Sequence, residues 1–439
     1  MKAKLIYLWE TIQTSFWFVP LLLVLAAIGS AIGLIFLDST IDFKPAGALG
    51  YLFSGGAEAA RGILSTIAGA MLAVAGTVFS ITLVALTLAS SQFGPRLLRN
   101  FMHDRLNQIV LGAYIATFIY CLLVLRTVKS DHDLDFIPNL SILFAIVVAV
   151  ANIFLLIIFI HHISLGIQAD TVISESYKNL NDSIEKLFPD QDKEEDSQLL
   201  ASRAQATLNA HIVADVVKSH QDGYLQVIDY DRLLELAHEH DLFIKILTRP
   251  GGFVVKQQPL AKVHARKKTD EKLLHHIRGS IIIGGQRTPL QDVEFAIRQM
   301  VEVAARALSP GINDPFTAIT CIDSLTATLA HLTRAHFPEK YRCDDDGAPR
   351  VEVHPLNFAG LIDASFNQIR QYGERSPSVL IRLMESLDTL MNFARSDEQK
   401  DAIQRHAAMV LETGESGITV KNDLNDLKTR YESLLKINV

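Results

Sequence analysis

Long apolar runs separated by short polar segments make up the N-terminal part of the chain. A helix needs about 20 apolar residues, rising 1.5 Å each, to cross a bilayer, and four runs have about this length. We therefore expect membrane-spanning helices at about 16–37, 63–89, 109–125 and 137–160. The first run is too long for the apolar core of a signal peptide, which predicts that it is a retained span.

One stripe of the second expected span differs from the rest of the membrane part. No charged side chain lies between Ile63 and Ala89. Small and hydroxyl side chains recur there at intervals of three and four residues, which places them on one face of a helix. This stripe consists of Thr66, Ala73, Thr77, Ser80, Val84, Thr87 and Ser91. Either it lines a pore shared between subunits, or it is a packing seam that lets helices approach closely.

The residues that follow this stripe combine a turn-forming pair with a basic side chain. Gln92, Gly94, Pro95 and Arg96 end the second span. They are interpreted either as a helix exit with a basic anchor or as a hinge or gate.

Basic residues near the ends of the spans predict the orientation of the chain. Lys2 and Lys4 precede the first span, and Arg96, Arg99 and Arg105 follow the second. Such residues favour the cytoplasmic side, although two basic residues between the third and fourth spans weakly oppose this orientation. Four spans return the chain to its starting side. Both termini are therefore expected in the cytoplasm.

The remainder of the chain has the pattern of a soluble α+β region. Residues 166–209 are expected to form a helical connector that contains the acidic run 190–197. Short β-rich segments within 210–286 flank turns at Asp222-Gly223 and Pro250-Gly251-Gly252, which predicts two hairpins and a small barrel or open sheet. Helical periodicity then dominates 287–439. The predicted fold is thus a four-helix membrane domain, residues 1–165, fused to a cytoplasmic α+β domain with a C-terminal helical bundle.

Composition restricts the classes of function. Residues 1–170 hold nine basic and nine acidic side chains, so the whole net charge of −7 belongs to the rest of the chain. An acidic soluble part argues against a nucleic-acid partner, because phosphate binding needs a basic surface. Cys121, Cys321 and Cys343 are too far apart for a CxxC motif, which predicts neither a disulfide framework nor a metal site. No cofactor is expected.

Five segments resemble the recurrent blocks of one protein family, in the same order. They are FSITLVALTLASSQFGPRLLRNF (79–101), GYLQVID (223–229), RPGGFVV (249–255), RTPLQD (287–292) and ALSPGINDPFTAI (307–319). The family comprises bacterial predicted membrane proteins and is catalogued as a domain of unknown function. The resemblance implies a four-span inner-membrane protein with a cytoplasmic domain. It implies no activity and assigns no functional residues.

Two short segments of the soluble part concentrate candidate contact residues. In the segment 309–317, Asp314 and Pro315 are suited to the N-cap and first position of a helix. This favours a structural turn over a ligand or interface loop. A catalytic role is disfavoured, because Ser309 lacks the G-x-S-x-G context of a serine nucleophile. The candidates are Arg287, Thr288 and Asp292 in the first segment, and Ser309, Asn313, Asp314 and Thr317 in the second.

Two functional hypotheses follow from these patterns. The first is a homo-oligomeric channel or transport protein in the lipid bilayer, with the second span lining the axis. The second is a membrane-anchored sensor or scaffold whose cytoplasmic domain binds a protein or a small ligand. The identity of any ion or ligand does not follow from the sequence, and an enzyme is the least favoured class.

Overall fold

A computed structural model describes residues 15, 17–41, 56–94, 104–129, 136–166, 168–188 and 197–436. The predictions that concern Pro95, Arg96, Arg99, the N-terminal lysines and the acidic run at 190–196 lie outside these residues. The chain divides into two compact units, residues 1–171 and 172–439.

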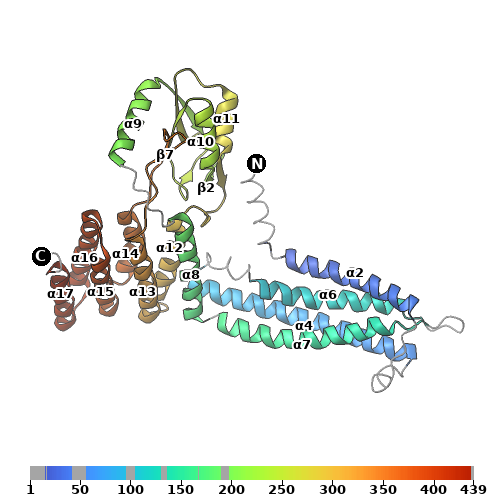
Figure 1. Cartoon of the computed structure of the whole chain (residues 1–439). Helices are drawn as coiled ribbons and strands as arrows, with labels where there is room; N and C mark the ends of the chain where they lie inside the picture. The colour runs from blue at the N-terminus through green and yellow to red at the C-terminus, as the bar shows by residue number, and fades with distance from the viewer. Residues whose placement is uncertain are drawn as a thin grey trace. The chain divides into compact units, whose positions relative to one another are not determined.

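The N-terminal unit contains four helices that are long and apolar enough to cross a membrane. They lie side by side in Figure 1 and confirm the four predicted spans. Their bounds are α2 (Phe18–Thr40), α4 (Gly56–Phe93), α6 (Arg105–Thr127) and α7 (Asn139–Gly166). Helix α4 has 38 residues, a length of about 57 Å, so it is considerably longer than a bilayer requires.

The four helices are held together by small-residue contacts and a few buried polar groups. A Cβ atom at Gly112 of α6 would lie 2.8 Å from the Cα atom of Pro20 in α2, so only glycine permits this approach. Asn152 of α7 is buried, and its Nδ2 donates to Thr117 Oγ1 of α6 at 2.8 Å. This hydrogen bond joins α7 to α6. It fits the tendency of amides in membranes to bond across helices.

Charged side chains fix both ends of this bundle. Asp38, near the end of α2, accepts hydrogen bonds from the backbone N–H groups of Leu140 and Ser141 at 2.9 and 3.0 Å. It thereby caps the start of α7, where N–H groups have no partner within their own helix. At the other end, His162 Nε2 lies 2.5 Å from Asp104 Oδ2.

The strands of the C-terminal unit form two sheets, with strand orders β1-β5-β3-β8-β7 and β4-β2-β6. Neighbours are antiparallel except β3 and β8, which are parallel. Neither sheet of the described residues closes into a barrel, so the predicted barrel is not confirmed, whereas a sheet-containing region is. The strands are β1 (Val213–Lys218), β2 (Gly223–Ile228), β3 (Phe243–Ile246), β4 (Phe253–Val254), β5 (Pro259–Ala265), β6 (Ile281–Gly284), β7 (Tyr341–Cys343) and β8 (Pro349–Glu352).

Both predicted hairpins are wrong. Strand β1 pairs with β5, whereas the next strand, β2, pairs with β4 and β6. Strand β3 pairs with β5 and β8 rather than with β4. The physical reason is burial: alternate side chains of β1 are exposed, whereas no residue of β2 is exposed. Two consecutive strands with such different surroundings belong to different sheets, whatever turn joins them.

Helices α12 to α17 confirm the predicted C-terminal helices, but the region 287–439 that was expected to be helical also contains β7 and β8, because β8 pairs with β3 of the first sheet. Helices α12 to α17 lie side by side in Figure 1. Helix α12 packs on α13 and α14, and α15 packs on α13, α16 and α17. The bounds are α8 (Ala169–Leu187), α9 (Ser197–Ala210), α10 (Tyr230–Glu239), α11 (Glu271–Gly279), α12 (Val293–Ala307), α13 (Pro315–Leu332), α14 (Phe358–Tyr372), α15 (Pro377–Phe393), α16 (Asp397–Gly417) and α17 (Lys421–Lys436).

Candidate functional site

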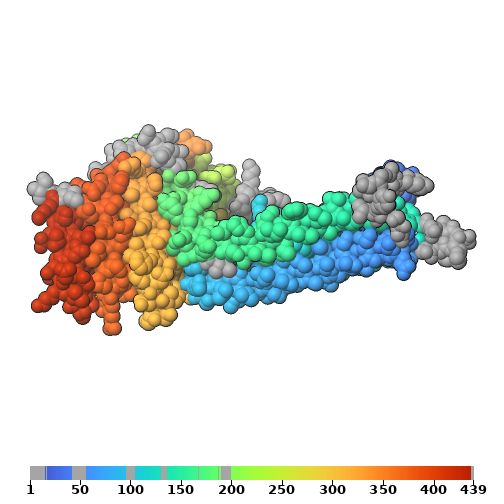
Figure 2. Space-filling view, turned by 90° about the horizontal axis from the view of Figure 1, so that it is seen from below, coloured from blue at the N-terminus to red at the C-terminus, as the bar shows by residue number. Residues whose placement is uncertain are grey.

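One face of α4 carries the small and hydroxyl stripe and is not covered by the other described helices of its unit. The opposite face packs in the bundle through residues such as Leu64, Met71 and Val78. Figure 2 shows α4, in blue, open along one side of the membrane unit next to α7, in green. The exposed stripe residues are Thr66, Ala73, Thr77, Ser80, Val84, Thr87 and Ser91.

The hydroxyl groups of this α4 face are bonded within their own helix. Those of Thr66, Thr77, Ser80 and Thr87 donate to the carbonyl oxygen four residues earlier, at distances of 2.7–3.2 Å. A hydroxyl oxygen that donates its proton in this way still has lone pairs that accept hydrogen bonds or contact a cation. This face of α4 therefore combines small side chains with oxygen atoms that can accept hydrogen bonds.

Sequence reasoning missed three glycines on the same face. Gly62, Gly69 and Gly76 recur every seven residues, each four positions before a stripe residue. A Cβ atom at any of them would have no neighbour within 4 Å in the described structure, so the fold of the subunit does not require glycine there. The seven-residue spacing of these glycines was the signal available in the sequence.

A glycine directly follows the last residue of α4. Gly94 has φ 109°, a conformation that favours glycine, and its N–H donates to Ser90 O at 3.2 Å. Gln92, two residues earlier, is exposed. This geometry agrees with a helix exit, while the hinge interpretation of the segment stays a prediction.

The two candidate segments of the soluble part lie at opposite ends of α12. Arg287, Thr288 and Asp292 lie before the helix, and the 309–317 turn follows it. The 15 residues of α12 separate the two groups by about 22 Å. The structure therefore does not bring them into one site.

The 309–317 turn is held by its own hydrogen bonds. Asp314 caps α13, because its Oδ1 accepts from the Thr317 N–H at 3.1 Å and its Oδ2 accepts from the Thr317 hydroxyl at 2.6 Å. These bonds lower the pKa of Asp314. Ser309 donates to Arg306 O at 2.6 Å, and Asn313 has a positive φ of 50°. Phe316 is 78% exposed, so the same turn presents an apolar side chain to its surroundings.

The segment before α12 forms a buried ion pair. Arg287 donates from Nε and Nη2 to the two carboxylate oxygens of Asp292, at 2.7 and 2.9 Å. Asp292 also caps α12 by accepting from the Phe295 N–H at 3.1 Å. Burial raises the pKa of Asp292, and Arg287 limits the rise. The Thr288 hydroxyl oxygen is buried without a hydrogen-bond partner among the described residues.

The loop that contains Gly251 packs directly on this ion pair. Gly251 has φ 85°, and a Cβ atom there would lie 2.1 Å from Asp292 Oδ2. The motif segments RPGGFVV and RTPLQD, which are far apart in the sequence, therefore meet at this point. We call the contact among Gly251, Arg287 and Asp292 the Arg287–Asp292 junction.

A cavity of about 510 Å³ lies beside the junction. Its basic and aromatic lining includes Arg249, Arg342 and Tyr230, with His336 and His354 completing the wall. The guanidinium carbon of Arg342 lies 3.9 Å from the centre of the Tyr230 ring. Arg342 Nε is buried without a hydrogen-bond partner among the described residues. The cavity thus offers an unused donor next to an aromatic face.

His238 of α10 and two aspartates of the β7–β8 turn form a cluster with the residue types of a metal site, but their own contacts explain it. His238 Nδ1 lies 3.0 Å from Asp344 Oδ2, and Asp346 is nearby. The same Asp344 oxygen also accepts from Arg350 Nε at 2.8 Å. Burial opposes ionisation of Asp344, but the bonds from His238, Arg350 and the Ala348 N–H outweigh it and lower its pKa to about 2. This carboxylate is already neutralised by protein groups.

Comparison with known proteins gives one family and several relatives. The model of a family described as Predicted membrane protein (DUF2254) matches residues 13–389, a stretch that includes all five motif segments. Uncharacterised proteins of Mycobacterium bovis and Mycobacterium tuberculosis are each 31% identical to the chain over 434 residues, which cover 96% of this chain and 80% of each relative. No solved structure matches the chain.

Proposed function

Because this chain belongs to the DUF2254 family of predicted membrane proteins, and four of its described helices suit a bilayer, we propose that it forms a homo-oligomeric channel in which α4 lines a shared axis. It is a membrane protein that contacts the lipid bilayer. The channel, the oligomer and the bacterial inner membrane as its location are the proposal.

The observation that carries the proposal is the uncovered stripe on α4. Large apolar residues such as Leu72, Phe79 and Leu88 are also exposed on this helix, and lipid is a suitable neighbour for them. Glycine and small hydroxyl residues gain little from lipid but let a second helix approach closely. Their seven-residue spacing matches the seam between helices that cross at about +20°. The occupant that fits this face is α4 of another copy.

The chemistry of the stripe favours cations over anions. Each bonded hydroxyl donates its proton to its own helix and presents only acceptor lone pairs to the axis. Rings of oxygen acceptors replace part of the hydration shell of a cation. An anion would need donors, and the described stripe offers none that is unused.

Cysteine labelling tests whether water reaches the stripe. In a background in which Cys121, Cys321 and Cys343 are replaced, Ser80→Cys is compared with Phe79→Cys, an adjacent position that faces away from the stripe. Intact membranes are treated with a membrane-impermeant charged thiol reagent. Labelling at position 80 but not at 79 supports a water-filled axis.

The same variants separate a pore from a packing seam. Oxidative cross-linking of Ser80→Cys into dimers without any labelling supports a seam between copies and contradicts the channel. If Ser80→Cys is neither labelled nor cross-linked, both the pore and the oligomer are contradicted.

The proposed orientation places both termini in the cytoplasm. Its support is the even number of spans and the basic residues that follow the second span in the sequence. A reporter that is active only outside the cytoplasm is fused after Val439. Activity of that fusion would contradict the orientation and would place the C-terminal unit on the opposite side of the membrane.

The cavity beside the junction supports a second candidate function, a membrane-anchored sensor. Five regions of the chain contribute to it, at 187–188, 230, 249–250, 291–292 and 336–356. The guanidinium of Arg342 lies over an aromatic ring, and its Nε has no hydrogen-bond partner among the described residues. Planar-bilayer recording distinguishes the two functions. Single-channel currents that disappear when Ser80 is replaced by Phe support the channel, and a protein that binds ligand but passes no current supports the sensor.

A further inference from the structure

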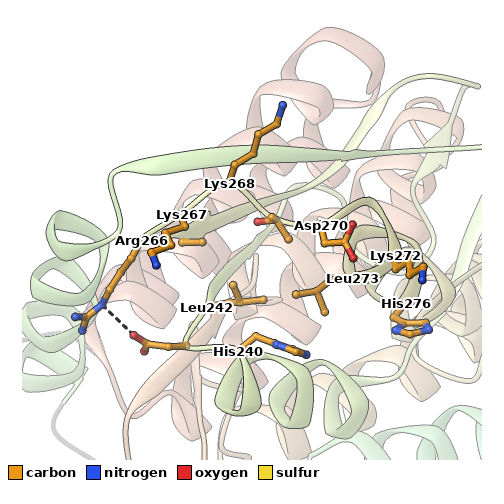
Figure 3. A pocket seen from close by; sticks show the side chains of 12 residues that line it. His240, Leu242, Arg266, Lys267, Lys268, Asp270, Lys272, Leu273 and His276 are labelled. Atoms are coloured by element: carbon orange, nitrogen blue, oxygen red, sulfur yellow. Dashed lines mark ion pairs between the residues drawn. The ribbon is translucent and has the colours of Figure 1, made fainter.

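A second cavity of the C-terminal unit, of about 530 Å³, has a basic rim. It is formed by the residues that follow α10, the end of β5 and the connection from β5 to α11. Figure 3 shows Arg266 on one side of the cavity and Lys272 with His276 on the other, with Leu242 and Leu273 between them. An apolar floor is thus surrounded by cationic and imidazole groups.

The rim carries a surplus of positive charge although its unit is acidic. Four cationic residues line the cavity, against the two carboxylates of Asp241 and Asp270. Asp241 is already neutralised, because Arg266 Nε lies 3.0 Å from its Oδ2 and Arg350 Nη1 lies 2.8 Å from its Oδ1. The cationic residues are Arg266, Lys267, Lys268 and Lys272.

Thr269 supplies an independent observation inside the basic rim. It is 9% exposed, and its backbone N–H donates to Asp215 Oδ2 at 2.8 Å. Its hydroxyl oxygen is buried and has no hydrogen-bond partner among the described residues. Leaving a buried hydroxyl unpaired is costly, so the cavity retains a polar group that the fold itself does not satisfy.

The start of α11 adds a favourable field at the same place. Asp270 is the N-cap residue, but its side chain makes no capping hydrogen bond. The first N–H groups of a helix lack partners in that helix and carry partial positive charge. Helix starts of this kind bind phosphate oxygens, and here a start that lacks a side-chain cap lies next to the lysines and Thr269.

We propose that this cavity binds the phosphate group of a small ligand, with Lys267 and Lys272 as counter-ions and the Thr269 hydroxyl as a donor to a phosphate oxygen. The apolar floor at Leu242 and Leu273 receives the carbon part of that ligand. A soluble phosphate ester and the phosphate headgroup of a lipid share this chemistry. The site does not depend on whether α4 lines a pore.

Calorimetric titration of the full chain in a non-ionic detergent tests the proposal. The probes are inorganic pyrophosphate, and dihexanoyl phosphatidate below its micellar concentration. We expect saturable binding that Lys267→Ala/Lys272→Ala weakens about tenfold or more, as expected for lost charged hydrogen bonds. Lys262→Ala, which removes an exposed lysine of β5 outside the cavity lining, is expected to leave the affinity unchanged.

Thr269→Val separates a loss of binding from a folding defect. Valine has the shape of threonine but no hydroxyl, so the ligand-free variant is expected to unfold at an equal or higher temperature. Its affinity for the phosphate probe is expected to fall about threefold to tenfold. Thr269→Ser is expected to restore the affinity.

Each outcome of the titration decides the question. Binding of pyrophosphate indicates that the cavity takes a soluble phosphate ester. Binding of phosphatidate alone indicates that it takes a lipid headgroup. Saturable binding of neither probe overturns the proposal. Equal weakening by Lys262→Ala and by the cavity variants also overturns it, because attraction would then come from the surface as a whole.

Discussion

The outer face of α4 and the Arg287–Asp292 junction satisfy polar side chains in opposite ways. On α4, hydroxyl groups bond to the backbone of their own helix, four residues earlier. At the junction, Arg287 bonds to the side chain of Asp292 five residues later, and this pair packs against the Gly251 loop, which is distant in the sequence. Substitutions in the first arrangement are expected to change the stability of the fold little, whereas the second arrangement joins parts of the fold. The difference separates a surface that is available for partners from one that the subunit needs for its own stability.

The largest expected effect is that of Gly251→Ala. An alanine with positive φ costs about 1–2 kcal/mol, and its Cβ atom would displace Asp292 from Arg287 and leave a buried charge without its partner. We expect the C-terminal unit to lose about 3 kcal/mol or more of unfolding free energy. Thermal and denaturant unfolding of the full chain in detergent measure the loss.

Gly285→Ala is the matched control for this substitution. A Cβ atom at Gly285 would have no neighbour within 4 Å, so this variant is expected to unfold like the unmodified chain. Equal stability of Gly251→Ala and Gly285→Ala would show that the junction does not hold the fold.

Asp38→Ala tests whether hydrogen bonds between distant segments also stabilise the membrane unit. The substitution leaves the backbone N–H groups of Leu140 and Ser141 without their acceptor, which is expected to cost about 1–3 kcal/mol. Ser39→Ala is the control, because the Ser39 hydroxyl donates to Phe36 O of its own helix. Similar midpoints of unfolding for the two variants would contradict the comparison.

The lowered pKa of Asp344 predicts that the unfolding free energy of the C-terminal unit falls at acidic pH. We call this fall the acid limb of its stability. The pKa of Asp344 is lowered from 3.8 to about 2, so its stabilising contribution of about 2 kcal/mol is complete above about pH 4. The contribution is lost as the pH falls from 4 to 2. Asp344→Asn is expected to reduce stability at neutral pH and to flatten that limb, as unfolding midpoints across the pH range measure. An unchanged acid limb in the variant would assign it to other groups.

Asp314→Ala measures the capping function of the 309–317 turn. Loss of an N-cap is expected to cost about 0.5–2 kcal/mol, whereas Asp314→Asn keeps a good cap and is expected to cost little. If Asp314→Ala abolished channel currents or ligand binding without changing the unfolding midpoint, the turn would be a contact loop instead of a structural element.

The smallest expected effect on subunit stability is that of Ser80→Ala. Its hydroxyl is exposed and bonded to Gly76 O at 2.9 Å, so a change within about 0.5 kcal/mol is expected. Thr117→Val, which removes the buried partner of Asn152, is expected to cost about 1–3 kcal/mol. A large loss for Ser80→Ala in the detergent-isolated subunit would show that the α4 face already serves the fold.

Local signals in the sequence account for the parts of the fold that were predicted correctly. Asp314 followed by Pro315 marks a helix start whose chemistry is complete within four residues, and α13 begins there. The turn signal at Asp222-Gly223 was equally local, yet it predicted the wrong strand pairing. A turn residue limits the backbone at one position, whereas pairing depends on which apolar faces are buried together.

The candidate site was predictable only in part for the same reason. The stripe on α4 followed from spacing alone, but its exposure depends on which face of α4 the bundle covers. The meeting of Gly251 with Asp292 has no local signal, because the two residues are joined only by packing.

By itself, the sequence determined that this chain has four membrane spans, that small and hydroxyl residues line one face of the second, and that helices follow a β-rich region. Each of these properties depends on the composition or period of one continuous segment. Tertiary structure alone decided which face of α4 the described helices leave uncovered and which strands share a sheet. It also decided that Thr269 lies in a basic cavity with no hydrogen-bond partner for its hydroxyl among the described residues. These properties depend on burial, and burial is set by the surfaces that distant segments present to one another.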